Sequence, residues 1–307
     1  MKGISSKLRE LKKLIEDSGL DARDELERLE AKLGSRLKTE TVWKRVELAR
    51  HPERPYAEDY IARIFDGFIE LHGDRCFGDD PAVIGGLGFL DSRPVTILAN
   101  QKGRSLKENL RRNHGMANPE GYRKSLRLAK EAEKFRRPII TLVDTAGACP
   151  GLGAEERGIG EAIARNLRDF SRLRTPVICV IIGEGGSGGA LGLCVGDKIY
   201  MLENAIYSVI SPEGCASILL RDAAKAKDAA VMLRITSDDL LEFKVINGII
   251  PEPPGGAHTD PDKTARIIRE ILSRDLEDLC SRNTEVLVRY RNQKIRKAGH
   301  WNESSGG

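Results

Sequence analysis

The chain has 307 residues, 40% of them hydrophobic and 5% aromatic, and its 50 basic and 46 acidic side chains leave a net charge of +4. This length supports one large domain with additions or two domains, and so small a charge does not indicate nucleic acid as a partner. No apolar run is long enough to span a membrane and the N-terminus lacks a signal-peptide core, so we expect a cytoplasmic protein. The six cysteines form no C-x-x-C pair, so the sequence indicates neither a zinc site nor a disulfide framework.

The first part of the chain, residues 1–50, is predicted to be a helical arm. Leucines recur at helical spacing over residues 4–50, and Ser18-Gly19 interrupts them, which predicts two amphipathic helices. These helices either form an arm that binds a partner or cap the protein's own core. His51-Pro52 ends the arm.

Residues 51–256 are predicted to form an α/β core in which strands and helices alternate. The expected helices cover residues 56–72, 119–135, 163–173, 225–233 and 237–243, with a short one starting at Pro212; the expected strands cover 83–90, 94–99, 139–143, 177–182, 197–202, 205–210 and 245–250. Residues 257–307 are predicted to add charged helices over 262–297 and a disordered tail.

Two glycine-rich loops follow successive strands of this core. One loop, 144–158, contains Gly147, Ala148 and Gly151, and the other, 183–189, contains five glycines within seven residues. Two right-handed crossovers bring the loops to the same edge of a parallel sheet, where open α/β sheets bind ligands. We therefore expect the functional site at this edge.

The second loop starts a helix, and we expect the backbone N–H groups of this loop to act in catalysis. The first N–H groups of a helix have no partner inside the helix and can hold a developing negative charge. Our central hypothesis is that the amides of Gly188 and Gly189 form an oxyanion hole.

Three other interpretations of the glycine run stay open. Gly185 to Gly189 matches the nucleophile elbow G-x-S-x-G with Ser187 as the nucleophile, but the only later histidines are His258 and His300. The same run matches a dinucleotide fingerprint, with Glu203 at the distance expected of a ribose contact. The third interpretation is close helix–strand packing without chemistry.

A basic stretch precedes the first loop and includes Lys102, Arg104, Lys107, Arg111 and Arg112. It is either a solvated face or a surface that attracts an anionic ligand, and the solvated face is favoured for most positions. It lacks interleaved aromatic residues, which argues against single-stranded nucleic acid.

Several segments resemble the alpha subunit of the heteromeric acetyl-CoA carboxylase carboxyltransferase, of bacterial or plastid type. The segments are Ala49-Arg50-His51-Pro52, Gln101-Lys102-Gly103-Arg104, Pro119-Glu120-Gly121-Tyr122-Arg123-Lys124, Gly153-Ala154-Glu155-Glu156-Arg157-Gly158, the run from Gly183 to Ala190, Ser208 to Ile218, and Ile249-Ile250-Pro251-Glu252-Pro253. The resemblance covers roughly residues 40–260.

The resemblance implies a crotonase-like α/β fold, a spiral of ββα units, and carboxyl transfer from carboxybiotin to acetyl-CoA to give malonyl-CoA. It implies a beta subunit that carries a zinc ribbon, the biotin carboxyl carrier protein and biotin carboxylase as partners, and an α2β2 heterotetramer. Carboxybiotin would bind mainly on this chain, near Gly185, Gly186, Gly147, Ala148 and Gly151. The amides of Gly188 and Gly189 would stabilise the oxyanion on the ureido group of biotin.

The chain departs from the family pattern in the first loop. Where the family usually has Pro-Gly-Ala-Tyr-Pro-Gly, this chain has Ala146-Gly147-Ala148-Cys149-Pro150-Gly151, so an aromatic side chain is replaced by Cys149. A carboxyltransferase acting on another acyl-CoA, a crotonase-fold serine hydrolase and a non-catalytic scaffold remain as alternatives.

Overall fold

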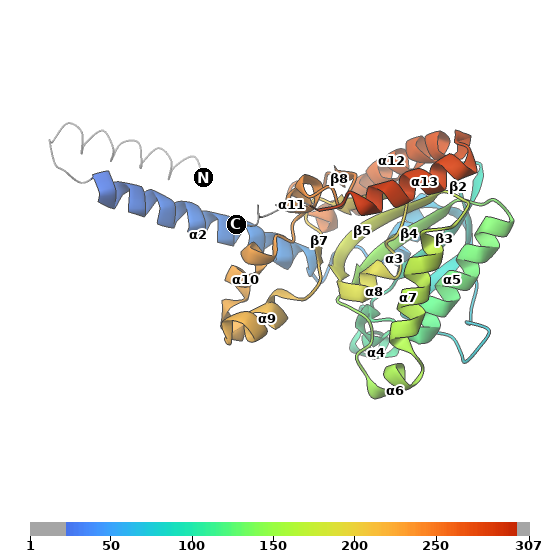
Figure 1. The fold of residues 1–307 in the computed structure, drawn as a ribbon, viewed down its shortest axis with the longest axis horizontal. Helices are drawn as coiled ribbons and strands as arrows, with labels where there is room; N and C mark the ends of the chain where they lie inside the picture. The colour runs from blue at the N-terminus through green and yellow to red at the C-terminus, as the bar shows by residue number, and fades with distance from the viewer. Residues whose placement is uncertain (1–22, 300–307) are drawn as a thin grey trace, which may run out of the picture.

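One mixed β-sheet organises the molecule, which we describe from a computed structural model over residues 23–299. The strands are β1 (Asp66–Glu70), β2 (Val83–Leu90), β3 (Arg93–Asn100), β4 (Ile139–Thr145), β5 (Val177–Gly186), β6 (Lys198–Leu202), β7 (Ile206–Ser208) and β8 (Gly248–Ile250). Their order is β1-β2-β3-β4-β5-β6-β8, and β7 pairs with the end of β5. The first three strands are antiparallel, whereas β3 to β6 and β8 run parallel (Figure 1).

The helices surround this sheet and fill the connections between its strands. The α-helices are α2 (Arg23–Ala49), α3 (Ala57–Ile64), α4 (Leu106–Arg111), α5 (Pro119–Lys134), α6 (Leu152–Glu156), α7 (Ile159–Phe170), α8 (Ser187–Leu191), α9 (Pro212–Cys215), α10 (Ala226–Leu233), α11 (Ser237–Glu242), α12 (Pro261–Ser281) and α13 (Thr284–Arg296). Short 3-10 helices occupy Asn113–Gly115, Ala223–Lys225 and Ala257–Thr259, and Ala216–Leu220 is a turn of π-helix. None of the helices over 23–299 is both long and apolar enough to cross a membrane.

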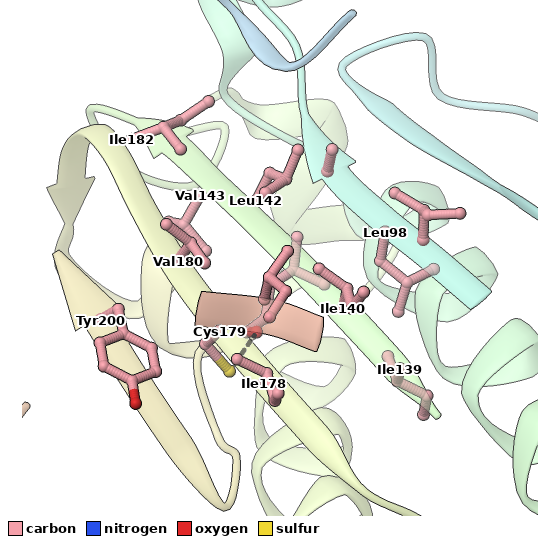
Figure 2. Packing of buried hydrophobic residues seen from close by; sticks show 14 of the residues in the cluster. Leu98, Ile139, Ile140, Leu142, Val143, Ile178, Cys179, Val180, Ile182 and Tyr200 are labelled. Carbon is pink, nitrogen blue, oxygen red and sulfur yellow. Dashed lines mark hydrogen bonds between the residues drawn. The ribbon is translucent and has the colours of Figure 1, made fainter. Parts of the chain in front are cut away.

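The core is centred on strands β4 and β5, as the apolar runs predict. Every residue of β4 is buried, so both faces of the sheet are covered, as is usual for parallel strands. Ile97, Ile140 and Ile178 are register partners on three neighbouring strands of this core, and Figure 2 shows Ile140 and Ile178 among its buried side chains. The core keeps the carboxyl ends of these strands in a defined position.

The arm that precedes the core is a single helix over the described residues. Helix α2 projects from the body of the molecule, and its final turns pack against α10, β5 and β7 (Figure 1). Val42, Val46 and Ala49 bury their side chains there against Ile206 and Ala230. The second of the two expected arm helices is therefore confirmed, while the first and the break at Ser18-Gly19 lie outside the described residues, as does the expected tail.

The last two helices are packed on the sheet rather than separate from it. Leu272, Leu276 and Leu287 belong to the main core cluster. Arg291 is buried and donates to both carboxylate oxygens of Asp197, at 2.9 and 2.6 Å, and to three backbone carbonyl oxygens at 2.8–2.9 Å. The guanidinium group therefore fastens α13 to the segments that flank β5.

The expected helix over residues 56–72 is wrong in its second half. Helix α3 ends at Ile64, because Phe65 is extended and Gly67 has a φ of +59°. The following residues form β1, which lies so close to β2 that a Cβ on Gly86 would come 2.2 Å from the carbonyl oxygen of Ile69. The apolar spacing fits either element, and the glycine that admits the extra strand lies some twenty residues later.

Candidate active site

The two glycine loops meet at the carboxyl ends of β4 and β5. A Cβ on Gly186 would come 2.0 Å from the carbonyl oxygen of Ala146, and one on Gly189 would come 2.3 Å from the carbonyl carbon of Gly147. No real Cβ tolerates such distances, so glycine at these two positions is what lets the loops touch. The prediction that both loops lie at one edge of the sheet is confirmed.

The turn between β5 and α8 presents backbone donors that the fold leaves unused. Ser187 starts the helix with a φ of +51°, which makes the change from strand to helix abrupt. Within residues 23–299, the amides of Gly188 and Gly189 donate to no acceptor. Gly188 is half-buried and Gly189 is buried, so these donors lie at the edge of the protein interior, where a hydrogen bond to an oxyanion is strong.

An apolar cavity of about 230 Å³ lies beside this turn. Its walls are Ser187, Gly188, Leu191, Tyr207, Ser208, Val209, Leu240 and Val245. None of these described lining residues is a histidine or a carboxylate, so a nucleophile at Ser187 would have no base in the cavity. Val209 at the rim is 75% exposed, which leaves apolar surface uncovered next to the free amides.

His258 and Glu203, which the nucleophile-elbow and dinucleotide interpretations require, make other contacts in the structure. His258 stacks on His51 with ring centroids 3.8 Å apart, and neither ring lines the cavity. Glu203 accepts a hydrogen bond from the backbone N–H of Glu252 at 3.1 Å. Within the described residues, His258 is therefore not placed for a serine hydrolase triad and Glu203 is not free for a ribose contact; His300 lies outside those residues.

Beneath the glycine turn lies an ionic cluster that the sequence analysis missed. The ammonium of Lys102 lies 2.7 Å from Asp144 Oδ1 and 3.2 Å from Glu184 Oε2, and Asp144 Oδ1 also accepts the N–H of Glu184 at 2.9 Å. A Cβ on Gly183 would come 2.5 Å from the same carboxylate oxygen, so glycine is needed there too. The ammonium of Lys102, which follows β3, therefore forms ion pairs with a carboxylate near the end of β4 and with another near the end of β5.

This cluster corrects the expectation of a solvated face at Lys102, whose side chain is only 14% exposed. Burial alone would lower the pKa of Lys102, but the charges of Asp144 and Glu184 outweigh it and raise the pKa above its usual value. Burial likewise favours neutral Glu184, yet Lys102 and Arg50 hold its pKa below the usual range. Arg104 and Arg112 pair with Asp59 and Glu58. The sequence does contain a pattern that could have predicted this cluster: a charged residue lies at or just after the end of each of three successive strands.

Arg50 connects the cluster to the arm and to α9. It directly follows α2, and its guanidinium lies 2.7 Å from Glu184 Oε1 and 2.7 Å from Glu213 Oε1. The end of the long helix, the glycine turn and the start of α9 are thus joined through one side chain. Across the described part of the chain, no group of three or more His, Cys, Asp or Glu residues is arranged to hold a metal ion.

The remaining expected site residues lie around the same turn. Gly185 and Gly186 end β5 and pair with Tyr207 and Ser208 of β7. A Cβ on Gly147 would meet nothing within 4 Å, so this part of the first loop borders open space. Ala148 and Cys149 pack against a small cluster of buried side chains, and Gly151 caps α6. Cys149 is therefore a packing residue of the loop in this structure.

Comparison with known proteins gives the chain's family. The family model described as acetyl co-enzyme A carboxylase carboxyltransferase-like matches residues 1–299. A relative from Treponema denticola, named acetyl-coenzyme A carboxylase carboxyl transferase subunit alpha, is 67% identical over 296 residues, 96% of this chain and 97% of its own length. A relative of the same name from a Geobacillus species is 52% identical over 303 residues, 97% of this chain and 93% of its own.

Solved structures support the fold at much lower identity. Transcarboxylase 12S, with methylmalonyl-coenzyme A bound, aligns with a TM-score of 0.56 at 20% identity over 82% of this chain and 44% of its own. A Pseudomonas malonate decarboxylase hetero-tetramer in complex with coenzyme A aligns with a TM-score of 0.58 at 18% identity, covering 72% of this chain and 91% of its own. The expected crotonase-like fold is confirmed. With the match along nearly its whole length, the chain belongs to the acetyl-coenzyme A carboxylase carboxyltransferase family.

Proposed function

We propose that this chain is the alpha subunit of the carboxyltransferase component of acetyl-CoA carboxylase. With a beta subunit it transfers the carboxyl group from carboxybiotin, held on the biotin carboxyl carrier protein, to acetyl-CoA, and malonyl-CoA is formed. The observation that carries this proposal is the 67% identity to a relative of that name over 96% of the chain. The free amides and the apolar cavity beside them are consistent with it.

In this proposal the chain contributes electrostatics and position rather than a side-chain nucleophile. Biotin, when bound, supplies the carboxyl group and afterwards a ureido nitrogen able to accept a proton from the acetyl methyl group. The amides of Gly188 and Gly189 would donate to the ureido oxygen of the bound group and stabilise negative charge there. Leu191, Tyr207 and Val209 line the adjoining cavity and would cover one side of the bound group. The site fits because two donors lack acceptors and an apolar space lies next to them.

The partners follow from the same proposal. A beta subunit with a zinc ribbon would complete the site in an α2β2 assembly, and biotin carboxylase would supply the carboxylated carrier. Two observations support a hetero-oligomer: the related malonate decarboxylase structures are a hetero-dimer and a hetero-tetramer, and apolar side chains such as Val209 border the site uncovered. The cytoplasmic location expected from the sequence stays a prediction.

The test is reconstitution with a matching beta subunit. The mixture is expected to carboxylate a biotin derivative in a malonyl-CoA-dependent reaction, and replacing malonyl-CoA by methylmalonyl-CoA tests the alternative acyl-CoA. An absence of turnover with every beta partner would contradict the proposal. Ser187→Ala is expected to keep turnover within a few-fold, whereas labelling of Ser187 by a fluorophosphonate would favour the hydrolase.

A matched pair of glycine variants tests the amides themselves. A Cβ on Gly188 would meet Ile163 at 3.7 Å, an ordinary contact, so Gly188→Val is expected to fold while its bulk covers the amide edge. Removing an oxyanion donor typically lowers kcat about 10²–10³-fold, and we expect a loss of that order. Gly160→Ala, on α7 with nothing within 4 Å, is the control and should keep full turnover.

A further inference from the structure

A cavity lined by arginines lies at the edge of the sheet opposite the glycine loops. Arg93 is the first residue of β3, Arg136 precedes β4 and Arg174 precedes β5. Because these three strands are parallel, their amino ends share one edge, and the glycine loops occupy the other. The cavity has a volume of about 560 Å³, and Arg282, in the segment joining α12 to α13, also lines it.

The positive charge in this cavity is mostly uncompensated. Arg282 pairs with Asp278 at 2.6 Å. By contrast, the guanidinium groups of Arg93, Arg136 and Arg174 form no ion pair with a carboxylate anywhere in residues 23–299. Glu133, the acidic residue of the lining, already accepts the backbone N–H of Arg174 at 2.7 Å.

The arginines of this cavity differ from the buried arginines of the chain, which are paired with carboxylates. Arg54 pairs with Glu252 at 2.6 Å and Arg291 pairs with Asp197 at 2.6 Å, each fully buried. Where an arginine serves packing, the fold supplies a carboxylate. Arg93, Arg136 and Arg174 are exposed instead, and with Glu133 as the one carboxylate of the described lining they leave the cavity with a net positive charge that would attract an anion.

The shape and lining of the cavity indicate the class of anion. Its volume falls within the range of small-molecule sites, and buried Leu279 and Leu287 give it an apolar wall beside the arginines. Guanidinium forks match the oxygens of phosphate in bidentate geometry, and several forks together favour a multiply charged group. We propose that this cavity binds a small organic diphosphate, at a position separate from the glycine loops.

Inorganic pyrophosphate is the probe, titrated calorimetrically into the full chain at 50 and 300 mM salt. We expect saturable one-to-one binding that weakens at high salt, and a rise in Tm with pyrophosphate concentration. The variant R93Q/R136Q/R174Q should fold, because these side chains are exposed, and should bind at least tenfold more weakly. The control R111Q/R266Q/R289Q removes the same charge from exposed positions elsewhere and should bind as the unmodified chain does.

Three outcomes would overturn the proposal. The first is no saturable binding of pyrophosphate at 50 mM salt. The second is equal weakening in the cavity variant and in the control variant, which would mean that overall charge, and not the cavity, attracts the anion. The third is binding of citrate as tight as that of pyrophosphate at matched ionic strength, which would mean that the site does not select phosphate. None of these measurements depends on carboxyl transfer.

Discussion

At the scale of single residues, the candidate site depends on one buried cation and on glycines that nothing else can replace. Lys102 compensates Asp144 and Glu184 where β4 and β5 end, and both glycine loops start from those carboxylates. Gly186 and Gly189 let the loops touch. The position of the free amides of Gly188 and Gly189 is therefore set by contacts behind them.

Removing the ammonium should be costly. Lys102→Met leaves two largely buried carboxylates without their shared cation, and breaking a buried pair in this way typically costs about 3–5 kcal/mol. We expect a loss of about that size in the free energy of unfolding, measured in urea. Lys107→Met, at an exposed position nearby, is the control and should change the value by less than about 0.5 kcal/mol. If Lys102→Met lowered the free energy of unfolding by no more than the control does, the stabilising role of the Lys102 ion pairs would be contradicted.

Neighbouring glycines of the turn should differ sharply in what they tolerate. Gly189→Ala would push a methyl group against the backbone of Gly147, whereas Gly188→Ala has an ordinary contact at 3.7 Å. We expect Gly189→Ala to destabilise the protein by about 1–3 kcal/mol and Gly188→Ala to be neutral or slightly stabilising, since alanine favours helix. Thermal unfolding of the two variants checks this, and equal Tm values would refute it.

At the scale of elements, side chains from distant segments hold the peripheral helices on the core. Arg50 joins the end of α2 to β5 and α9, and Arg291 joins α13 to the segments flanking β5. Helix α3 ends early because β2 has glycines that let an extra strand lie against it. Helical periodicity is local, whereas the ion pairs of Arg50 and Arg291 link residues 94 to 163 positions apart.

Loss of the Arg291 guanidinium should loosen α13 selectively. Arg291→Met leaves buried Asp197 and three backbone carbonyl groups without their hydrogen-bond donor. We therefore expect faster amide exchange over Thr284–Arg296 and a destabilisation of about 3–5 kcal/mol. Arg289→Met, on the exposed side of the same helix, is the control. Unchanged exchange in α13 of the Arg291 variant would show that apolar packing alone holds the helix.

At the scale of the whole molecule, acid stability should depend on the loop before β2. Burial alone would raise the pKa of Asp74, but the backbone N–H groups of Cys76, Phe77 and Gly78 and the guanidinium of Arg123 lower it from 3.8 to about 2. A pKa lowered by folding contributes stability that is fully present above the unfolded value and is lost as pH falls through the folded one.

The expected result is a fall of about 2 kcal/mol in unfolding free energy from this residue between pH 4 and pH 2. Asp74→Asn should lower stability at pH 7 and flatten the pH dependence in that window. Urea unfolding at several pH values measures both effects, and Asp228→Asn, at an exposed position, is the control. A variant whose profile runs parallel to that of the unmodified chain between pH 2 and pH 4 would contradict the assignment.

The sequence by itself determined the alternation of strands and helices, the two glycine loops at one edge, the crotonase-like fold and the family. The alternation and the loops follow from periodicity and from glycine runs after apolar strands, whereas the fold and the family are implied by the resemblance of several segments to a known family. All of these are local properties of the chain. Only the tertiary structure decided that residues 66–70 form a strand, that Lys102 joins Asp144 and Glu184, and that Arg93, Arg136 and Arg174 surround one cavity. The physical reason is that ion pairing and burial depend on which segments meet in space, and spacing along the chain does not specify that.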